Sequence, residues 1–101
     1  MPRILKQDAQ KMLGKVPNEY AFKCCDGRIL TDMVELGAGL GTMSDAVFAY
    51  HVNEAKNDFT SWVRHILKDE KLASDLHKAN SRKQAADRVA ERLEILKRAL
   101  K

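Results

Sequence analysis

The sequence predicts a mainly α-helical (α+β) single domain, in which four to five short helices pack with one β-hairpin in the N-terminal half. Apolar residues recur at helical spacing through most of the chain. A single pair of strand-like runs flanks Asp26-Gly27. The 101 residues provide one core and no second one. With 45% hydrophobic and 32% charged residues, the composition is that of a globular domain.

The N-terminal part predicts a short basic helix over residues 3–14, because Pro2 lies at its start and Gly14 and Pro17 follow it. Residues 20–30 then form two strand-like runs around Asp26-Gly27. This dipeptide tolerates the positive φ angles of a two-residue type I′ turn. Since a hairpin alone is marginally stable in water, we expect it to lie against helices.

Helices in the middle of the chain are marked by residues that favour the N-cap position. Asp32 with Glu35 resembles a capping box that opens a helix over 33–40, which Gly41 can end. Further caps are expected at Ser44, Asn57-Asp58 and Asp69. The apolar spacing after Asn57-Asp58 makes that helix the centre of the core. The predicted core residues are Phe22, Leu36, Phe48, Phe59, Trp62 and Ile66.

The last helix, over residues 82–100, begins with a second capping box formed by Ser81 and Gln84. Its apolar residues follow the alternating spacing of three and four that is typical of a coiled coil. Two heptads are too few for a free coiled coil, so we expect the stripe to pack on the chain's own core. Self-association is the alternative, through Val89, Leu93, Leu96 and Leu100.

Positive charge is concentrated at the two ends of the chain. Residues 1–16 carry four basic and one acidic side chain, residues 17–80 seven and ten, and residues 81–101 seven and three. The basic ends can dock on the acidic middle, or they can present a surface to phosphates. The candidate basic surface consists of Lys11, Lys15, Arg82, Arg88, Arg92 and Arg98.

A glycine-rich stretch over residues 34–41 resembles the cofactor loop of S-adenosylmethionine-dependent methyltransferases. In that family the loop follows a long buried strand within a βαβ unit. Here Leu30-Thr31-Asp32-Met33 precedes it, and no βαβ pattern follows. We therefore interpret Gly37, Gly39 and Gly41 as positions for a close helix crossing and a turn.

The residue types that hold metals are present, but their spacing predicts no metal site and no cofactor. Adjacent Cys24 and Cys25, with His51, His65 and His77, lack the paired spacing of a structural zinc site. The adjacent cysteines are also poorly placed to pair with each other as a disulfide.

His51 ends one predicted helix, and Asn57-Asp58 begins the next after a short turn. The imidazole is therefore expected to hydrogen-bond Asp58 across the turn. We interpret His51, Asn57 and Asp58 as a structural clasp, because the sequence places no nucleophile beside them. An acid–base pair is the alternative reading.

Several of these features together resemble a family of small archaeal and bacterial domains of unknown function. The likeness covers residues 20–79, and its most distinctive part is His51-Val52 followed by Asn57-Asp58-Phe59-x-x-Trp62. The resemblance implies a fold and no mechanism. The basic terminal helices lie outside the matched core.

The function predicted from these observations is that of a non-catalytic interaction module, which binds a protein partner or a second copy. The alternative is a small basic nucleic-acid-binding protein that uses the terminal helices. No catalytic set emerges from the spacing, so no enzyme is expected. With no apolar run long enough for a membrane span or a signal peptide, we expect a cytoplasmic protein that does not bind membranes.

Overall fold

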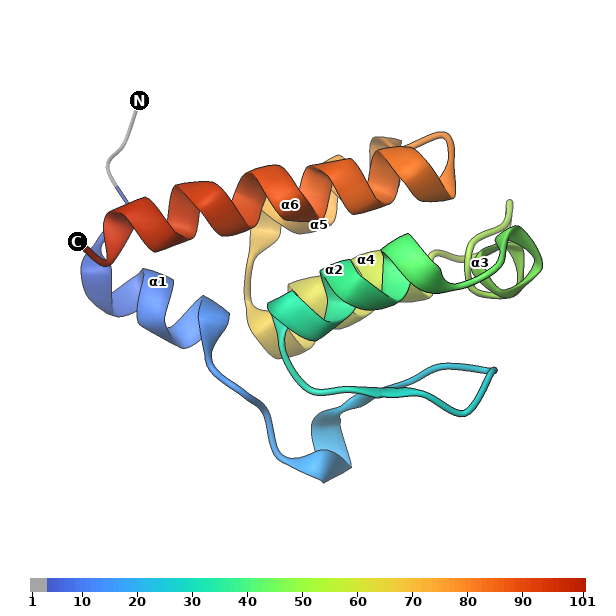
Figure 1. The fold of residues 1–101 in the computed structure, drawn as a ribbon, viewed down its shortest axis with the longest axis horizontal. Helices are drawn as coiled ribbons and strands as arrows, with labels where there is room; N and C mark the ends of the chain where they lie inside the picture. The colour runs from blue at the N-terminus through green and yellow to red at the C-terminus, as the bar shows by residue number, and fades with distance from the viewer. Residues whose placement is uncertain (1–3) are drawn as a thin grey trace.

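A computed structural model describes residues 4–101 and confirms the predicted fold class: six α-helices and one antiparallel hairpin in the N-terminal half (Figure 1). The start of the predicted first helix lies outside the described residues. In chain order the elements are α1 (Lys6–Leu13), the 3₁₀ turn η1 (Asn18–Tyr20), β1 (Phe22–Lys23), β2 (Ile29–Leu30), α2 (Met33–Thr42), α3 (Asp45–His51), α4 (Asp58–Trp62), the π-helical turn η2 (Val63–Leu67), α5 (Glu70–Lys78) and α6 (Arg82–Ala99).

Helices α2 to α6 begin at side chains that accept a hydrogen bond from the first turn, whereas α1 follows Leu5 and has no side-chain cap. Such N-caps are confirmed at Asp32, Ser44, Asn57, Asp69 and Ser81. Asp58 does not share the capping role, because the Asn57 carboxamide alone accepts from the Thr60 amide, at 3.0 Å. The expected end of α2 at Gly41 is also wrong. The helix continues to Thr42, and Gly41 does not adopt the left-handed conformation that ends helices.

The hairpin turn is longer than the sequence suggested. The Cys24 amide donates to the Arg28 carbonyl (2.9 Å), and the Gly27 amide donates to the Cys24 carbonyl (3.0 Å). Cys25 and Asp26 therefore form the centre of the turn, and Gly27 follows at φ +96°. This is a three-residue loop with a glycine bulge and not a two-residue type I′ turn, because only one of its residues needs a positive φ.

The core lies mainly among the packed helices, and the hairpin adds Phe22, Cys24 and Leu30 to it. Four of the predicted core residues, Phe22, Leu36, Phe59 and Trp62, are buried. Phe48 and Ile66 are half-buried at its edge. Phe22 stacks on Phe59 with ring centroids 4.8 Å apart. Aromatic contacts of this kind hold the short hairpin against α4.

The helices α2 and α6 lie side by side (Figure 1). A Cβ atom at Gly37 would lie only 3.1 Å from Cγ1 of Val89, which confirms that this glycine permits a close helix crossing. The glycine stretch thus belongs to a helix, which excludes the methyltransferase loop geometry. Val89 and Leu96 are fully buried in the crossing, while Leu93 and Leu100 are half-buried. The C-terminal stripe therefore packs on the chain's own core.

None of the helices in residues 4–101 combines the length and the apolar character that crossing a bilayer requires.

Candidate functional site

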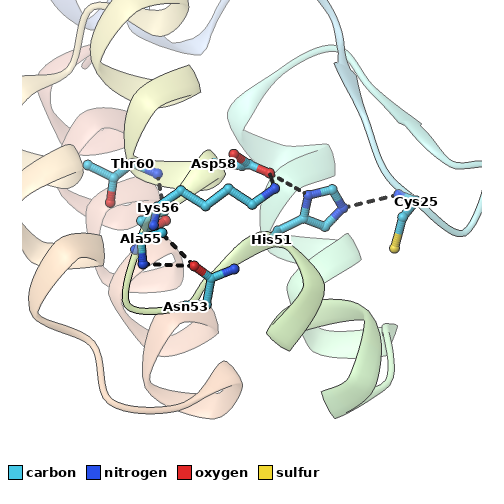
Figure 2. A network of polar contacts seen from close by, with 8 residues as sticks. Cys25, His51, Asn53, Ala55, Lys56, Asp58 and Thr60 are labelled. Atoms are coloured by element: carbon cyan, nitrogen blue, oxygen red, sulfur yellow. Dashed lines mark hydrogen bonds and ion pairs between the residues drawn. The ribbon is translucent and has the colours of Figure 1, made fainter.

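The predicted contact between His51 and Asp58 is present. Nδ1 of His51 lies 2.9 Å from Oδ2 of Asp58 (Figure 2). Between them, Val52 and Asn57 form an isolated antiparallel bridge, so His51 and Asp58 are the residues that flank a small turn. The Asn53 side chain closes this turn by accepting from the amides of Ala55 (2.9 Å) and Lys56 (3.2 Å).

The other imidazole nitrogen contacts the hairpin. The Cys25 amide donates to Nε2 of His51 at 3.1 Å (Figure 2). Nε2 is therefore the acceptor of a neutral imidazole whose proton is on Nδ1, where it is donated to Asp58. His51 is only 4% exposed. The residue thus joins the hairpin to the start of α4, as the structural clasp requires.

Asp58 also binds Lys56, whose Nζ lies 3.0 Å from Oδ2 and 4.9 Å from the centre of the Tyr50 ring. Partial burial acts to raise the pKa of Asp58, but the hydrogen bonds from His51 and Lys56 outweigh this effect and lower it. The carboxylate is therefore ionised at neutral pH. It fixes the imidazole and carries no proton to donate.

The structure brings both cysteines to His51, which the sequence spacing did not indicate. The ligand atoms of Cys24, Cys25 and His51 all lie within 4.8 Å of one another. Cys24 is buried and Cys25 is exposed. Burial raises the pKa of the Cys24 thiol, and this effect outweighs the hydrogen bond with the Asp26 backbone, which acts to lower it. Two adjacent cysteines just before the predicted hairpin turn were the only sequence signal, because His51 lies 26 residues from Cys25.

The sequence placed no nucleophile beside His51 and Asp58, but the fold brings the Cys25 thiol close to His51. The pair is nevertheless not arranged as a general base toward Cys25. The Nε2 lone pair that would take a thiol proton is already used by the Cys25 amide. The Gly27 amide, a nearby donor that could stabilise an oxyanion, is used by the Cys24 carbonyl.

The candidate basic surface is largely neutralised by ion pairs. Arg92 is not on the surface: its side chain is 11% exposed and binds the fully buried Asp69, at 2.7 Å. Four others are paired at the surface, namely Lys15 with Asp32 and Glu35, Arg82 with Asp45, Arg88 with Glu91, and Arg98 with Glu94. Of the six candidate cations, only Lys11 has no carboxylate of residues 4–101 within 4 Å. Several cations of the basic ends thus dock on the acidic middle of the chain.

An apolar groove runs between β2 and α2. It has a volume of about 410 Å³ and is lined by Arg28, Ile29, Leu30, Glu35, Ala38, Gly39 and Thr42. We call it the β2–α2 groove. Ile29 is 55% exposed, and Val34, one helical turn before Ala38, is 48% exposed. This is a hydrophobic surface that the fold leaves uncovered.

The backbone of β2 is unpaired beside this groove. Cys24 and Arg28 form a hydrogen-bonded pair, so the next pair, Lys23 and Ile29, is of the non-hydrogen-bonded type. The amide and carbonyl of Ile29 consequently face away from β1. Two residues further along, the Thr31 carbonyl accepts from the Val16 amide (2.8 Å), and the Thr31 amide donates to the Glu35 carboxylate (2.6 Å). Within residues 4–101, no such partner serves Ile29.

In comparisons with protein-family models, curated proteins and solved structures, none matches this chain. The fold and the sites are therefore assigned from the chain's own geometry.

Proposed function

We propose that this protein is a non-catalytic interaction module that binds an extended segment of a protein partner in the β2–α2 groove. The observation that carries the proposal is the unpaired backbone of Ile29 beside an exposed apolar groove. A third strand added at this edge would pair with the amide and carbonyl of Ile29. Its alternate side chains would contact Leu30 and Ala38.

The charges at the groove favour an apolar occupant. Arg28 contacts Asp26 and Thr42, and Glu35 contacts Lys15 and Thr31. Both rim charges are therefore already paired within the chain. A partner segment with one or two apolar side chains and no charge requirement matches this lining.

Paired charges also make a nucleic-acid surface the less supported alternative. Phosphate binding depends on cations that release counterions on contact. Five of the six candidate cations are engaged with carboxylates of the same chain. The net charge of +4 is then the main support for a nucleic-acid-binding function.

A random peptide library displayed on phage, selected against the immobilised full chain, tests the proposal. We expect enriched peptides with alternating apolar residues. Mapped by ¹H–¹⁵N NMR, they should shift the amide signals of Ile29, Leu30 and Ala38. The substitution Ala38→Gln should weaken their binding at least about tenfold by filling the groove. Ala90→Gln, at an exposed position of α6, is the matched control and should have no effect.

Three outcomes would count against the proposal. Peptides that bind Ala38→Gln as well as the wild type would show that the groove is not the site. A dimer in light scattering that Ala38→Gln dissociates would make a second copy the occupant. Binding of duplex DNA or structured RNA that falls steeply with rising salt would favour the nucleic-acid function.

A further inference from the structure

We propose that Cys24, Cys25 and His51 form a zinc-binding site at the hairpin turn. The site is separate from the β2–α2 groove, and the inference does not rest on the proposed function. It rests on the convergence of two thiols and one imidazole nitrogen within 4.8 Å. Two of the three residues, Cys25 and His51, are labelled in Figure 2. Two sulfur ligands and one nitrogen ligand suit a borderline-soft cation such as Zn²⁺.

The present separations are close to those of a zinc site. Zinc binds thiolate sulfur at about 2.3 Å and imidazole nitrogen at about 2.0–2.1 Å, so ligand atoms on a tetrahedral ion lie roughly 3.5–4 Å apart. The three ligand atoms here need to approach one another by up to about 1.3 Å. Rotation of the exposed Cys25 side chain provides much of this movement.

The turn explains why adjacent cysteines reach one ion. In a regular strand the side chains of neighbouring residues point to opposite faces. Cys25, however, is the first central residue of the hairpin loop, where the chain changes direction. Both sulfurs therefore lie near His51.

The contact of His51 with Asp58 is of the kind that orients a metal-bound histidine. Metal-bound histidines commonly donate their other ring N–H to a carboxylate, which fixes the ring and makes the ligand nitrogen more basic. Here Nδ1 faces Asp58 at 2.9 Å, and Nε2 faces the turn. A bound ion would use the Nε2 lone pair in place of the Cys25 amide. Because that amide nitrogen lies 3.1 Å from Nε2, the turn at Cys25 must move away from His51 for the ion to bind. Since Cys25 is exposed, water can then satisfy that amide.

The surroundings suit a neutral metal centre with one exposed side. The imidazole is packed among Phe22, Tyr50 and Phe59. Binding of Zn²⁺ releases one proton from each of the two thiols, so the ion and its two thiolates carry no net charge. The exposed Cys25 gives the ion access, and water completes the four-coordinate shell.

Titration of the reduced, chelator-treated full chain with Zn²⁺ tests the site, with native mass spectrometry to give the stoichiometry. We expect one bound ion, release of two protons, and thiolate-to-metal charge-transfer absorption when Co²⁺ replaces Zn²⁺. Zinc should also raise the Tm of the wild-type protein, because it binds the folded chain.

Cys25→Ser is the decisive variant, because it removes an exposed thiol and retains the backbone amide that binds His51. We expect it to weaken zinc binding at least about tenfold and to abolish the zinc-dependent rise in Tm. Asp58→Asn should weaken zinc binding about 10- to 100-fold, because the imidazole loses the carboxylate that orients it, and Asp58→Glu should restore part of the affinity. His77→Gln, at an exposed position of α5, is the control and should bind as the wild type does.

Zinc affinity that is unchanged in Cys25→Ser would overturn the proposal, as would binding that His77→Gln removes. Tight binding of Cu⁺ without binding of Zn²⁺ would overturn the assignment of the ion. Failure of the peptide experiment would leave this inference intact, because the two sites share no ligand residue.

Discussion

Arg92 on α6 donates to both carboxylate oxygens of Asp69, at 2.7 and 3.0 Å, and Asp69 has no exposed surface. The same carboxylate also caps α5 through the Leu72 amide. The long C-terminal helix is thus joined to the start of α5 by a buried, two-point ion pair. Such geometry compensates the cost of burying both charges.

The substitution Arg92→Met is expected to lower the free energy of unfolding by about 3–5 kcal/mol, because it leaves the Asp69 carboxylate buried without its partner. Urea denaturation followed by circular dichroism measures the loss. Arg88→Met on the same helix removes a surface pair with Glu91 and should cost about 1 kcal/mol or less. Equal losses in the two variants would show that the buried pair has no special role.

Two glycines of α2 should respond to substitution in opposite directions. Gly37→Val places methyl groups against Val89 and Leu93, and overpacking of this kind costs about 1–3 kcal/mol. Gly41→Ala meets nothing within 4 Å and should stabilise the helix by about 0.5–1 kcal/mol. Thermal unfolding of both variants checks the signs. A stabilising Gly37→Val would contradict the close crossing of α2 and α6.

The contribution of Glu35 to the free energy of unfolding should depend on pH. The side chain and amide of Thr31 donate to the carboxylate, and these bonds, with Lys15 nearby, lower its pKa below the ordinary 4.5. A lowered folded-state pKa gives stability that is present above the unfolded-state pKa and is lost as the pH falls through the folded value. Glu35→Gln should therefore be less stable than the wild type at pH 7.

The difference between the two proteins should shrink as the pH falls below about 4.5 and vanish once the folded-state carboxyl is protonated. Urea titrations at a series of pH values between neutrality and acid measure it. A difference that stays constant over this range would exclude the ionised carboxylate as its source.

Trp62 connects α4 with the segment before the hairpin, since its Nε1 donates to the Tyr20 carbonyl at 2.8 Å. Trp62→Ala should cost about 3–5 kcal/mol, because it removes a large buried side chain. Trp62→Phe keeps much of the packing and loses the hydrogen bond. Its loss of unfolding free energy should therefore be smaller than that of Trp62→Ala, with about 1 kcal/mol of it due to the bond. Far-UV circular dichroism is the suitable readout, because Trp62 is the single tryptophan. Equal costs for both variants would argue against a packing role.

Features determined by short-range interactions could be predicted from the sequence. The N-caps Asp32, Ser44 and Ser81 each bond to an amide three residues later, so the residue type and the pattern that follows are sufficient. The His51–Asp58 contact was predictable for the same reason, since only seven residues separate the two.

The length of the hairpin turn and the tertiary contacts could not be predicted in this way. Asp26-Gly27 suits both a two-residue turn and a three-residue turn with a glycine bulge, and the register of the strands decides between them. The contact of Cys25 with His51 spans 26 residues and depends on where the hairpin docks.

The burial of Arg92 could have been predicted from its position in the apolar stripe of α6, although its charge favoured a surface position. It follows Val89 by three residues and precedes Leu96 by four, so it lies on the buried face of α6. A charged residue within an apolar stripe indicates a buried partner, here Asp69, rather than a surface for phosphates. The partner itself was not identifiable, because it lies 23 residues away.

The hairpin has no third strand, and its contacts with the helices join residues far apart in the chain: Cys25 with His51, and Tyr20 with Trp62. Closing loops of 26 and 42 residues has an entropic cost that the local helical turns do not bear. We therefore expect the hairpin to dock late in folding, onto helices that have already formed. For the same reason, in the native protein it should be the first part to exchange its amide hydrogens with solvent.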